Sequence, residues 1–302
     1  LVALYNYFAI CYFERVYMKA RVIAYYLPQF HPIKENDEYW GKGFTEWTNV
    51  AKAKPLFRGH YQPHIPADLG FYDLRLPEVR EAQAELARDA GIEGFCYYHY
   101  WFGNGKMLLQ KPFEEVLRLG KPDFPFCLCW ANHDWTTKTW VKGSSMVNNT
   151  MIAQQEYLGE QDDIKHFEYC LRAFKDHRYI TIEGKPIFLI YDPLSFPNVK
   201  EFMNRWNFLA KKNNLKGIYF IGVTTGRQSS YKIVTNLGFD GVCHNRRWEA
   251  EAKAAGFRFV RRMQSLLGWH LCISLMKYDY NKVVRNYDTP ENKLENCYPV
   301  IT

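Results

Sequence analysis

Short apolar runs alternate with amphipathic stretches along most of this chain, and that alternation is typical of an α/β fold. The apolar runs predict strands at residues 21–27, 93–100, 124–130, 185–191, 217–223, 239–242 and 298–302. Each run is nearly continuous in apolar character, so the sheet should be buried on both faces, as parallel sheets are.

The stretches between the strands have a helical period. They predict helices at residues 77–90, 111–119, 155–176, 199–213, 231–237 and 256–267. In the first of these, Pro77 stands at the start, while Val79, Ala82 and Leu86 mark one apolar face. Six or seven β/α units in series favour a (β/α)8 TIM-barrel-like fold that is incomplete.

The first residues differ from the rest of the chain. Residues 1–13 are apolar and aromatic but too short to cross a bilayer, and they lack the basic start of a signal peptide. Met18 directly precedes the first predicted strand. We therefore expect residues 1–17 to be a non-native or upstream extension, with a weak membrane anchor as the alternative, and residues 18–302 to form the barrel domain.

Composition and charge exclude several classes of function. A net charge of +7 is spread over 302 residues without a long basic run, which argues against a nucleic-acid partner. The eight cysteines form no CxxC pair, and several lie inside apolar runs, so reduced thiols and a cytoplasmic location are expected. Neither a metal-binding spacing such as HExxH nor a glycine-rich phosphate loop is present, so no metal and no cofactor are predicted.

Candidate chemistry lies where the predicted strands end, because barrels carry their sites at the carboxyl ends of their strands. Aromatic rings there can stack on sugar C–H faces, and polar groups can meet hydroxyls, so an oligosaccharide or polysaccharide is the expected partner. The candidate substrate-binding residues are Tyr26, Gln29, His31, Glu46, Trp47, His64, Tyr98, Tyr100, Trp101, Trp130, Asn132 and Asp192.

Several of these candidates have a structural alternative. Tyr98 and Tyr100 share one strand face, whereas neighbouring positions point to the other face and must pack under helices. His64 could satisfy loop backbone groups, Glu46 could clamp its loop, and Asp192 could cap the next helix.

Two long strings carry a resemblance to a known family. The run from Ala24 to Phe102, which begins AYYLPQFHP and contains GFTEWTNVAKAKPLFRGHYQPH, and the run KPDFPFCLCWAN at residues 121–132 resemble WbsX-type proteins of the glycoside hydrolase family 99-like group. That group is encoded with O-antigen, lipopolysaccharide and rhamnan synthesis genes, is named as glycosyltransferases, and has relatives that are (β/α)8 barrels acting on α-mannosides. The resemblance implies a barrel, a glycan substrate and retaining glycosyl chemistry.

The chain departs from the family pattern at two places. His133 stands where the family has an acidic residue after Trp-Ala-Asn. The family's catalytic carboxylates lie in an Asn-Glu-Trp-x-Glu-Gly-type segment near the C-terminus, and no such segment is present, so we expect a C-terminally truncated barrel domain. The catalytic residues are unknown, since Glu46, the best local carboxylate, cannot replace a pair.

Three functions remain open from the sequence. The first is glycoside hydrolysis or glycosyl transfer on an α-linked glycan by a parent protein, with this chain lacking the carboxylate pair. The second is a non-catalytic glycan-binding remnant. The third is a nucleotide-sugar-dependent glycosyltransferase, which the missing phosphate loop and DxD motif do not favour.

Overall fold

The computed structural model describes residues 20–55, 59–137, 150–224, 230–254, 279–287 and 289–300. The strands are β1 (Ile23–Tyr26), β2 (Gly94–Trp101), β3 (Met107–Leu108), β4 (Phe126–Trp130), β5 (Trp135–Thr136), β6 (Met151–Ala153), β7 (Thr181–Ile182), β8 (Lys185–Ile190), β9 (Tyr219–Val223), β10 (Gly241–His244) and β11 (Cys297–Pro299). The helices are α2 (Lys34–Trp40), α3 (Glu46–Lys52), α4 (Pro77–Asp89), α5 (Lys111–Leu119), α6 (Glu160–Phe174), α7 (Val199–Lys212), α8 (Tyr231–Asn236), α9 (Arg247–Ala254), α11 (Tyr280–Arg285) and the 3-10 helix η2 (Pro290–Lys293).

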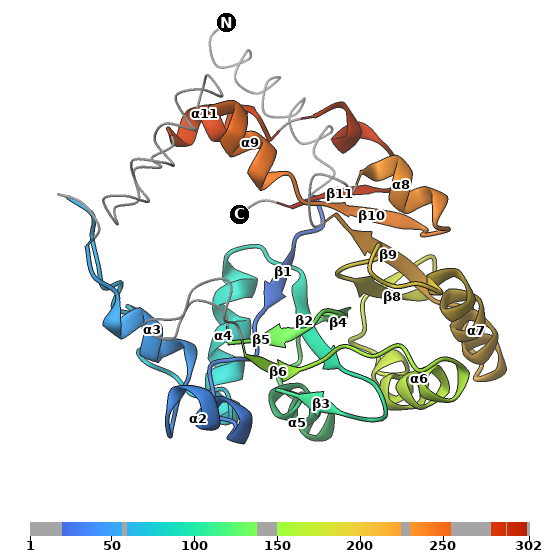
Figure 1. The fold of residues 1–302 in the computed structure, drawn as a ribbon, viewed down its shortest axis with the longest axis horizontal. Helices are drawn as coiled ribbons and strands as arrows, with labels where there is room; N and C mark the ends of the chain where they lie inside the picture. Colours follow the sequence, from blue (N-terminus) through green and yellow to red (C-terminus); the bar gives the residue numbers. More distant parts are fainter. Residues whose placement is uncertain are drawn as a thin grey trace, which may run out of the picture.

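Seven of the strands form one parallel sheet in the order β1-β2-β4-β8-β9-β10-β11. The order follows the chain, as it does in a barrel, and helices α4, α5, α6 and α7 lie on the outer side of the sheet (Figure 1). The short strands β3 and β7 pair antiparallel with β2 and β8, and β5 and β6 form a separate hairpin. The predicted α/β class and the incomplete barrel are confirmed.

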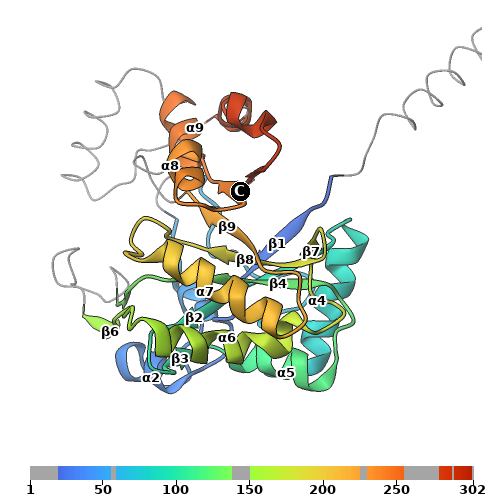
Figure 2. The same cartoon turned by 90° about the vertical axis from the view of Figure 1, so that its right-hand side faces the viewer.

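The sheet is curled, and one side-chain contact shows how far. The hydroxyl group of Tyr25 on β1 lies 3.1 Å from the Sγ atom of Cys243 on β10. These strands stand first and sixth in the sheet order, so their side chains can meet only across the concave side. The described strands therefore form a half-barrel, open between β11 and β1, and its arc is visible in Figure 1. Figure 2 shows α6 and α7 side by side in front of the sheet.

The apolar core lies mainly between the convex side of the sheet and the helices. Trp206 of α7 is fully buried against Phe188 of β8 and Phe202, and its Nε1 atom donates to the backbone oxygen of Asp163 at 3.0 Å. Burying a large apolar side chain contributes about 1.5–3 kcal/mol. This outer layer holds α6 and α7 against the sheet, which fixes the positions of the strand ends.

Two short helices lie in the segment between β1 and α4, where the sequence pattern predicted only a loop. In α3, the Thr45 hydroxyl accepts from the backbone N–H of Trp47, while the Thr48 hydroxyl accepts from the backbone N–H of Thr45. This reciprocal capping stabilises a helix that is too short to show an apolar period. Its first residue is Glu46.

Some predicted boundaries shift. The helix predicted at 155–176 begins only at Glu160, because Gly159 has φ = 79° and the chain before it forms β6 and an extended segment. The seventh strand is Cys297–Pro299, slightly earlier than the predicted 298–302. The predicted helix at 256–267 and the predicted extension at 1–17 fall outside the described residues.

Candidate functional site

Strand alternation divides the side chains of β2 between the two sides of the sheet. His99 and Trp101 point outward to α6, because the Nε2 atom of His99 lies 2.8 Å from that of His166 and Trp101 Nε1 donates to Asp162 at 3.1 Å. Tyr98 lies between them in sequence and therefore points to the concave side. A candidate site inside the half-barrel must be built from this second set of side chains.

The concave side carries a group of aromatic rings that we call the inner aromatic face. Tyr25 and Tyr98 are stacked with their centroids 5.3 Å apart, and Tyr191 meets Tyr98 edge-on at 6.0 Å. His133 lies beside Tyr191 at 5.5 Å. Together with Tyr100, these residues are half-buried, so their rings retain accessible surface.

The inner aromatic face continues toward the loops at the carboxyl ends of the strands. Tyr100 stacks on Trp135 of β5 with the ring centroids 5.9 Å apart. The centroid of Trp135 in turn lies 6.4 Å from that of Trp40 on α2. Glu46 at the start of α3 is half-buried and lies close enough to Tyr100 to help raise the pKa of that phenol. A carboxylate therefore borders the aromatic rings.

Burial keeps the phenols of this face uncharged. It raises the pKa of Tyr98 and of Tyr100 well above the ordinary tyrosine value, and neighbouring cysteine and tyrosine groups act in the same direction. Burial also raises the pKa of Cys243, to about 11. The face thus offers ring surfaces and neutral hydroxyl groups, which suit an uncharged, hydroxyl-rich ligand.

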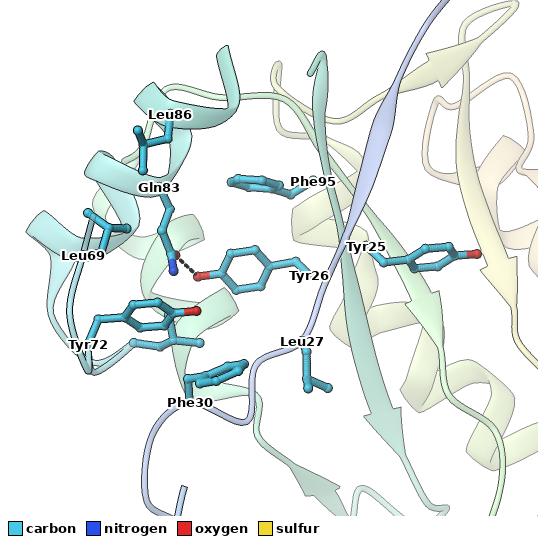
Figure 3. A pocket seen from close by; sticks show the side chains of 10 residues that line it. Tyr25, Tyr26, Leu27, Phe30, Leu69, Tyr72, Gln83, Leu86 and Phe95 are labelled. Atoms are coloured by element: carbon cyan, nitrogen blue, oxygen red, sulfur yellow. Dashed lines mark hydrogen bonds between the residues drawn. The ribbon is translucent and has the colours of Figure 1, made fainter. Parts of the chain in front are cut away.

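Three of the predicted aromatic residues point to the outer, helical side. The Tyr26 hydroxyl donates to Oε1 of Gln83 on α4 at 2.6 Å, and Figure 3 shows Tyr25 and Tyr26 on opposite sides of β1. Trp101 stacks on His166. Trp130 is buried beside α7, and its Nε1 atom donates to the backbone oxygen of Trp101 at 2.9 Å. These rings contribute packing, and a glycan contact for them stays a prediction.

A cavity of about 440 Å³ lies on this outer side, between β1, α4 and the chain before α4. Tyr26, Phe30, Tyr72, Leu86 and Phe95 are among its lining residues (Figure 3). Its wall is chiefly apolar. Tyr25 of the inner aromatic face also contributes to the lining, although its ring points to the other side of β1. The hollow therefore lies beside the concave site, with β1 between most of its lining and the inner aromatic face.

Gln29 and His31 follow β1 and are buried, with exposed fractions of 4% and 1%. The Nε2 atom of Gln29 and both ring nitrogens of His31 have no hydrogen-bond partner among the described residues. Burial lowers the pKa of His31, so its imidazole is neutral near pH 7. The backbone oxygen of Gln29 accepts from the backbone N–H of Glu46 at 3.3 Å, which ties this segment to the start of α3.

Trp47 and His64 lie at the periphery. Trp47 Nε1 donates to the backbone oxygen of Tyr72 at 2.8 Å, and its ring packs on Phe30, so it fastens α3 to the chain before α4. His64 is exposed and contacts the ring of Tyr61 edge-on. The structure brings neither side chain to the inner aromatic face.

Asn132 and Asp192 lie together where β4 and β8 end. The Asn132 amide bonds both backbone groups of Asp192, at 2.7 and 2.8 Å. The Asp192 carboxylate accepts from the hydroxyl of Ser195 at 2.7 Å. The Asn132 side chain thus holds the backbone of Asp192, and the Asp192 carboxylate holds Ser195. Asp192 does not cap the next helix, α7, whose N-cap residue is Asn198.

The predicted residues that the structure brings together are Tyr98, Tyr100 and Glu46. The candidate set omitted Tyr25, Tyr191 and His133, although the sequence held a signal for them. Tyr25 and Tyr191 belong to the strand face shared by Tyr98, and a consistent parity across strands would have selected them.

One group of potential metal ligands lies among the described residues. Donor atoms of His99, His166 and Cys170 lie within 4.8 Å of one another in the outer layer. The two Nε2 atoms are only 2.8 Å apart, which is a hydrogen-bond distance. Two imidazole ligands at about 2.0–2.1 Å from a tetrahedral ion would stand farther apart. The observed geometry is that of a hydrogen-bonded histidine pair.

Within the described residues, no helix is long and apolar enough to cross a bilayer.

The sequence is similar to one protein family over almost its whole length. Residues 22–302 match the family described as glycosyltransferase WbsX. Two relatives, both called uncharacterized protein WxcX and both from Xanthomonas campestris pv. campestris (strains B100 and ATCC 33913), are 41% identical over 225 residues. The match covers 74% of this chain but only 31% of each relative, so the chain spans about a third of their length.

Solved structures show a weaker likeness. A GH99 endo-alpha-mannosidase from Bacteroides thetaiotaomicron in complex with BIS-TRIS-propane is 16% identical, with a TM-score of 0.42, over 74% of this chain and 58% of its own. Another structure of the enzyme gives a TM-score of 0.41 at 16% identity, over 74% and 60%. Similarity this low carries no argument about chemistry.

Proposed function

Because the chain belongs to the glycosyltransferase WbsX family, we propose that it is a carbohydrate-active protein that binds an α-linked glycan of a bacterial surface polysaccharide, such as an O-antigen or a rhamnan. The inner aromatic face carries this proposal. Stacked and edge-on rings of Tyr25, Tyr98 and Tyr191 present apolar surface beside neutral phenol groups and the Glu46 carboxylate. Sugar rings are recognised by this combination of C–H stacking and hydroxyl hydrogen bonding.

The glycan would lie along the concave side of the half-barrel. Tyr98 and Tyr191 would contact its C–H faces, while Tyr100 and Glu46 would bond hydroxyl groups toward the loop end. Binding an uncharged glycan does not require a charge to be buried. The low-dielectric surroundings that raise the pKa values of Tyr98 and Tyr100 therefore do not oppose its binding.

We further propose that this chain binds its glycan without cleaving it. Retaining glycosidases need two carboxyl groups about 5–5.5 Å apart. Among the described residues, Glu46 places a carboxylate beside the inner aromatic face, whereas the Asp192 carboxylate accepts from the Ser195 hydroxyl where β8 ends. Since the match covers only 31% of each WxcX relative, any catalysis would belong to a longer protein in which residues 18–302 form part of a barrel domain.

We also propose a cytoplasmic location. The six cysteines of the described residues are buried and form no disulfide, and reduced thiols are typical of cytoplasmic proteins.

Binding can be measured by isothermal titration with soluble α-mannan and with a purified bacterial rhamnan as probes. Tyr98→Ala and Tyr191→Ala should each weaken binding about 2- to 10-fold, because a lost stacking contact is worth about 0.5–1.5 kcal/mol. Tyr61→Ala is the matched control, since Tyr61 is 67% exposed and lies outside the concave side. Neither polysaccharide should release reducing ends during incubation.

Two outcomes would contradict the proposal. One is that neither polysaccharide binds the unaltered chain. The other is that Tyr61→Ala weakens binding as much as the two inner substitutions. Tight binding of a nucleotide sugar in place of the polysaccharides would favour the transferase alternative.

A further inference from the structure

Asn132 was predicted to contact a sugar, but its side chain makes its hydrogen bonds within the protein. It is fully buried, and its Oδ1 atom accepts from the backbone N–H of Asp192 at 2.7 Å. Its Nδ2 atom donates to the backbone oxygen of Asp192 at 2.8 Å and to the Tyr157 hydroxyl at 2.9 Å. The Tyr157 hydroxyl in turn donates to the backbone oxygen of Asn132 at 3.1 Å. Both ends of the amide are therefore bound to protein groups.

These contacts extend the sheet beyond its last backbone pair. The β4–β8 ladder ends at Trp130 and Ile190, and the backbone N–H of Tyr191 still donates to the Trp130 oxygen at 3.0 Å. At the next residue, Asp192, the Asn132 side chain supplies the acceptor and the donor that a neighbouring strand would supply. An amide is the side chain that can offer both at one position.

The residue held in place by this extension is Tyr191. It lies between the last ladder pair and the Asn132 clamp, and its ring contacts Tyr98 and His133 on the inner aromatic face. With the backbone bonded on both sides of the residue, the direction of its Cα–Cβ bond is fixed. A rotation of this backbone would move the ring off the face.

We propose that Asn132 is a positioning residue that orients Tyr191 for glycan binding, and that it does not itself contact the glycan. The inference rests on the proposed function. The proposal explains why the Tyr191 ring stays on the inner aromatic face. Tyr191 follows the end of β8, and the backbone hydrogen bonds between β4 and β8 do not extend to the next residue, Asp192.

Asn132→Asp is the informative variant. It keeps the side-chain shape and the acceptor for the Asp192 N–H, but it loses both donated hydrogen bonds and places a carboxylate against the Asp192 carbonyl oxygen. We expect α-mannan binding to weaken about 2- to 10-fold, by the same factor as in Tyr191→Ala. The double variant with Tyr191→Ala should bind no more weakly than either single variant, because both remove the same contact.

Amide hydrogen exchange provides a readout without ligand. The Asp192 amide should exchange at least 10-fold faster in Asn132→Asp, whereas the Ile190 amide, bonded within the ladder, should keep its rate. If Asn132→Asp does not fold, Tyr157→Phe replaces it, because it weakens the same clamp from the other side, with a smaller effect of the same pattern expected.

The outcomes separate the claims. Additive losses in the double variant, or faster exchange throughout the sheet, would show that Asn132 acts on general stability and would overturn the positioning role. Faster Asp192 exchange with unchanged mannan affinity would overturn it too. If the unaltered chain binds no mannan, the proposed function fails. Exchange at Asp192, together with the nuclear magnetic resonance shifts of the Tyr191 ring in Asn132→Asp, then decides whether Asn132 orients that ring.

Discussion

A pair of buried histidines stands out at the scale of single residues. His99 and His166 share one hydrogen bond, and they are enclosed by the rings of Trp101 and Tyr169. Burial lowers the pKa of His99 to about 3 and that of His166 well below its ordinary value, with His99 adding to the effect on His166. Both imidazoles are therefore neutral near pH 7, one donating its N–H to the other.

This pair should make stability fall in mild acid. The folded pKa of each histidine is lower than the unfolded value of about 6.5, so its contribution is complete above pH 6.5 and is lost as the pH falls toward 3. For His99 alone, the loss between pH 7 and pH 5 is about 2 kcal/mol. Urea unfolding followed by circular dichroism at several pH values measures it.

The matched variant for this test is His99→Gln, which keeps hydrogen-bonding capacity but cannot be protonated. Other groups also titrate in this range, and Asp163, whose pKa burial raises to about 6, acts with the opposite sign. The difference between the two chains removes that contribution. Equal pH dependence in the unaltered chain and in His99→Gln would show that His99 does not take up a proton on unfolding.

The residue scale is also where the sequence was least informative about the site. The sequence shows that aromatic residues cluster at the strand ends. It does not show which side of the sheet each ring faces, since neighbours such as Tyr25 and Tyr26 have the same side chain and point to opposite sides. Only the strand register decides between them, and it depends on contacts distant in sequence, such as that between Tyr25 and Cys243.

At the scale of elements, one buried arginine joins three segments of the outer layer. Arg178, with its side chain 2% exposed, follows α6 and pairs with Asp176. Its guanidinium also donates to the backbone oxygens of Pro122 at 2.9 Å and Val116 at 3.2 Å, and it lies over the ring of Phe126. It thereby satisfies carbonyl groups at and after the end of α5 and fixes that helix against β4.

Arg178→Lys should therefore destabilise the fold although it conserves charge. An ammonium group cannot reach the carboxylate and both carbonyl groups at once, so buried acceptors lose partners at a cost of about 2 kcal/mol. The control is Arg172→Lys on the exposed side of α6, which should change stability by less than about 0.5 kcal/mol. Equal urea midpoints for the two variants would contradict this role of Arg178.

The elements themselves were largely predictable. Continuous apolar runs correctly indicated all seven strands of the parallel sheet, and apolar periodicity indicated α4 through α8. Helices α2 and α3, of seven residues each, were not predicted, because no apolar stripe marks them. The capping box fixes α3, and packing of Trp40 and Trp47 holds the two helices in place. These short helices matter, since α3 brings Glu46 to the inner aromatic face.

At the scale of the whole molecule, the curl of the sheet separates two environments. The convex side is a dense aromatic core under the helices, and the concave side holds half-buried tyrosines around a bordering carboxylate. The composition suggested sugar-binding rings without showing which of the two sides they would occupy. The curl follows from strand order and twist, so it became visible only once the strands were paired.

The same curl leaves two sheet edges. Among the described residues, β1 pairs only with β2 and β11 only with β10, and parallel edges with unpaired backbone groups are templates for association. Leu27 and Leu86 add exposed apolar surface beside β1, with 36% and 46% of each exposed. We therefore expect the chain to self-associate as its concentration rises through the micromolar range.

Charges placed beside β1 should reduce this association. Leu27→Lys combined with Leu86→Lys should move the protein toward the monomer in size-exclusion chromatography with light scattering, because a charge at a strand edge opposes pairing with another chain. Phe208→Lys is the control, since Phe208 is 67% exposed on α7, far from β1 in the sheet order. A monomer at every concentration with a sharp cooperative melt would show that the edge does not promote association, and an equal effect of the control would assign the association to general surface hydrophobicity.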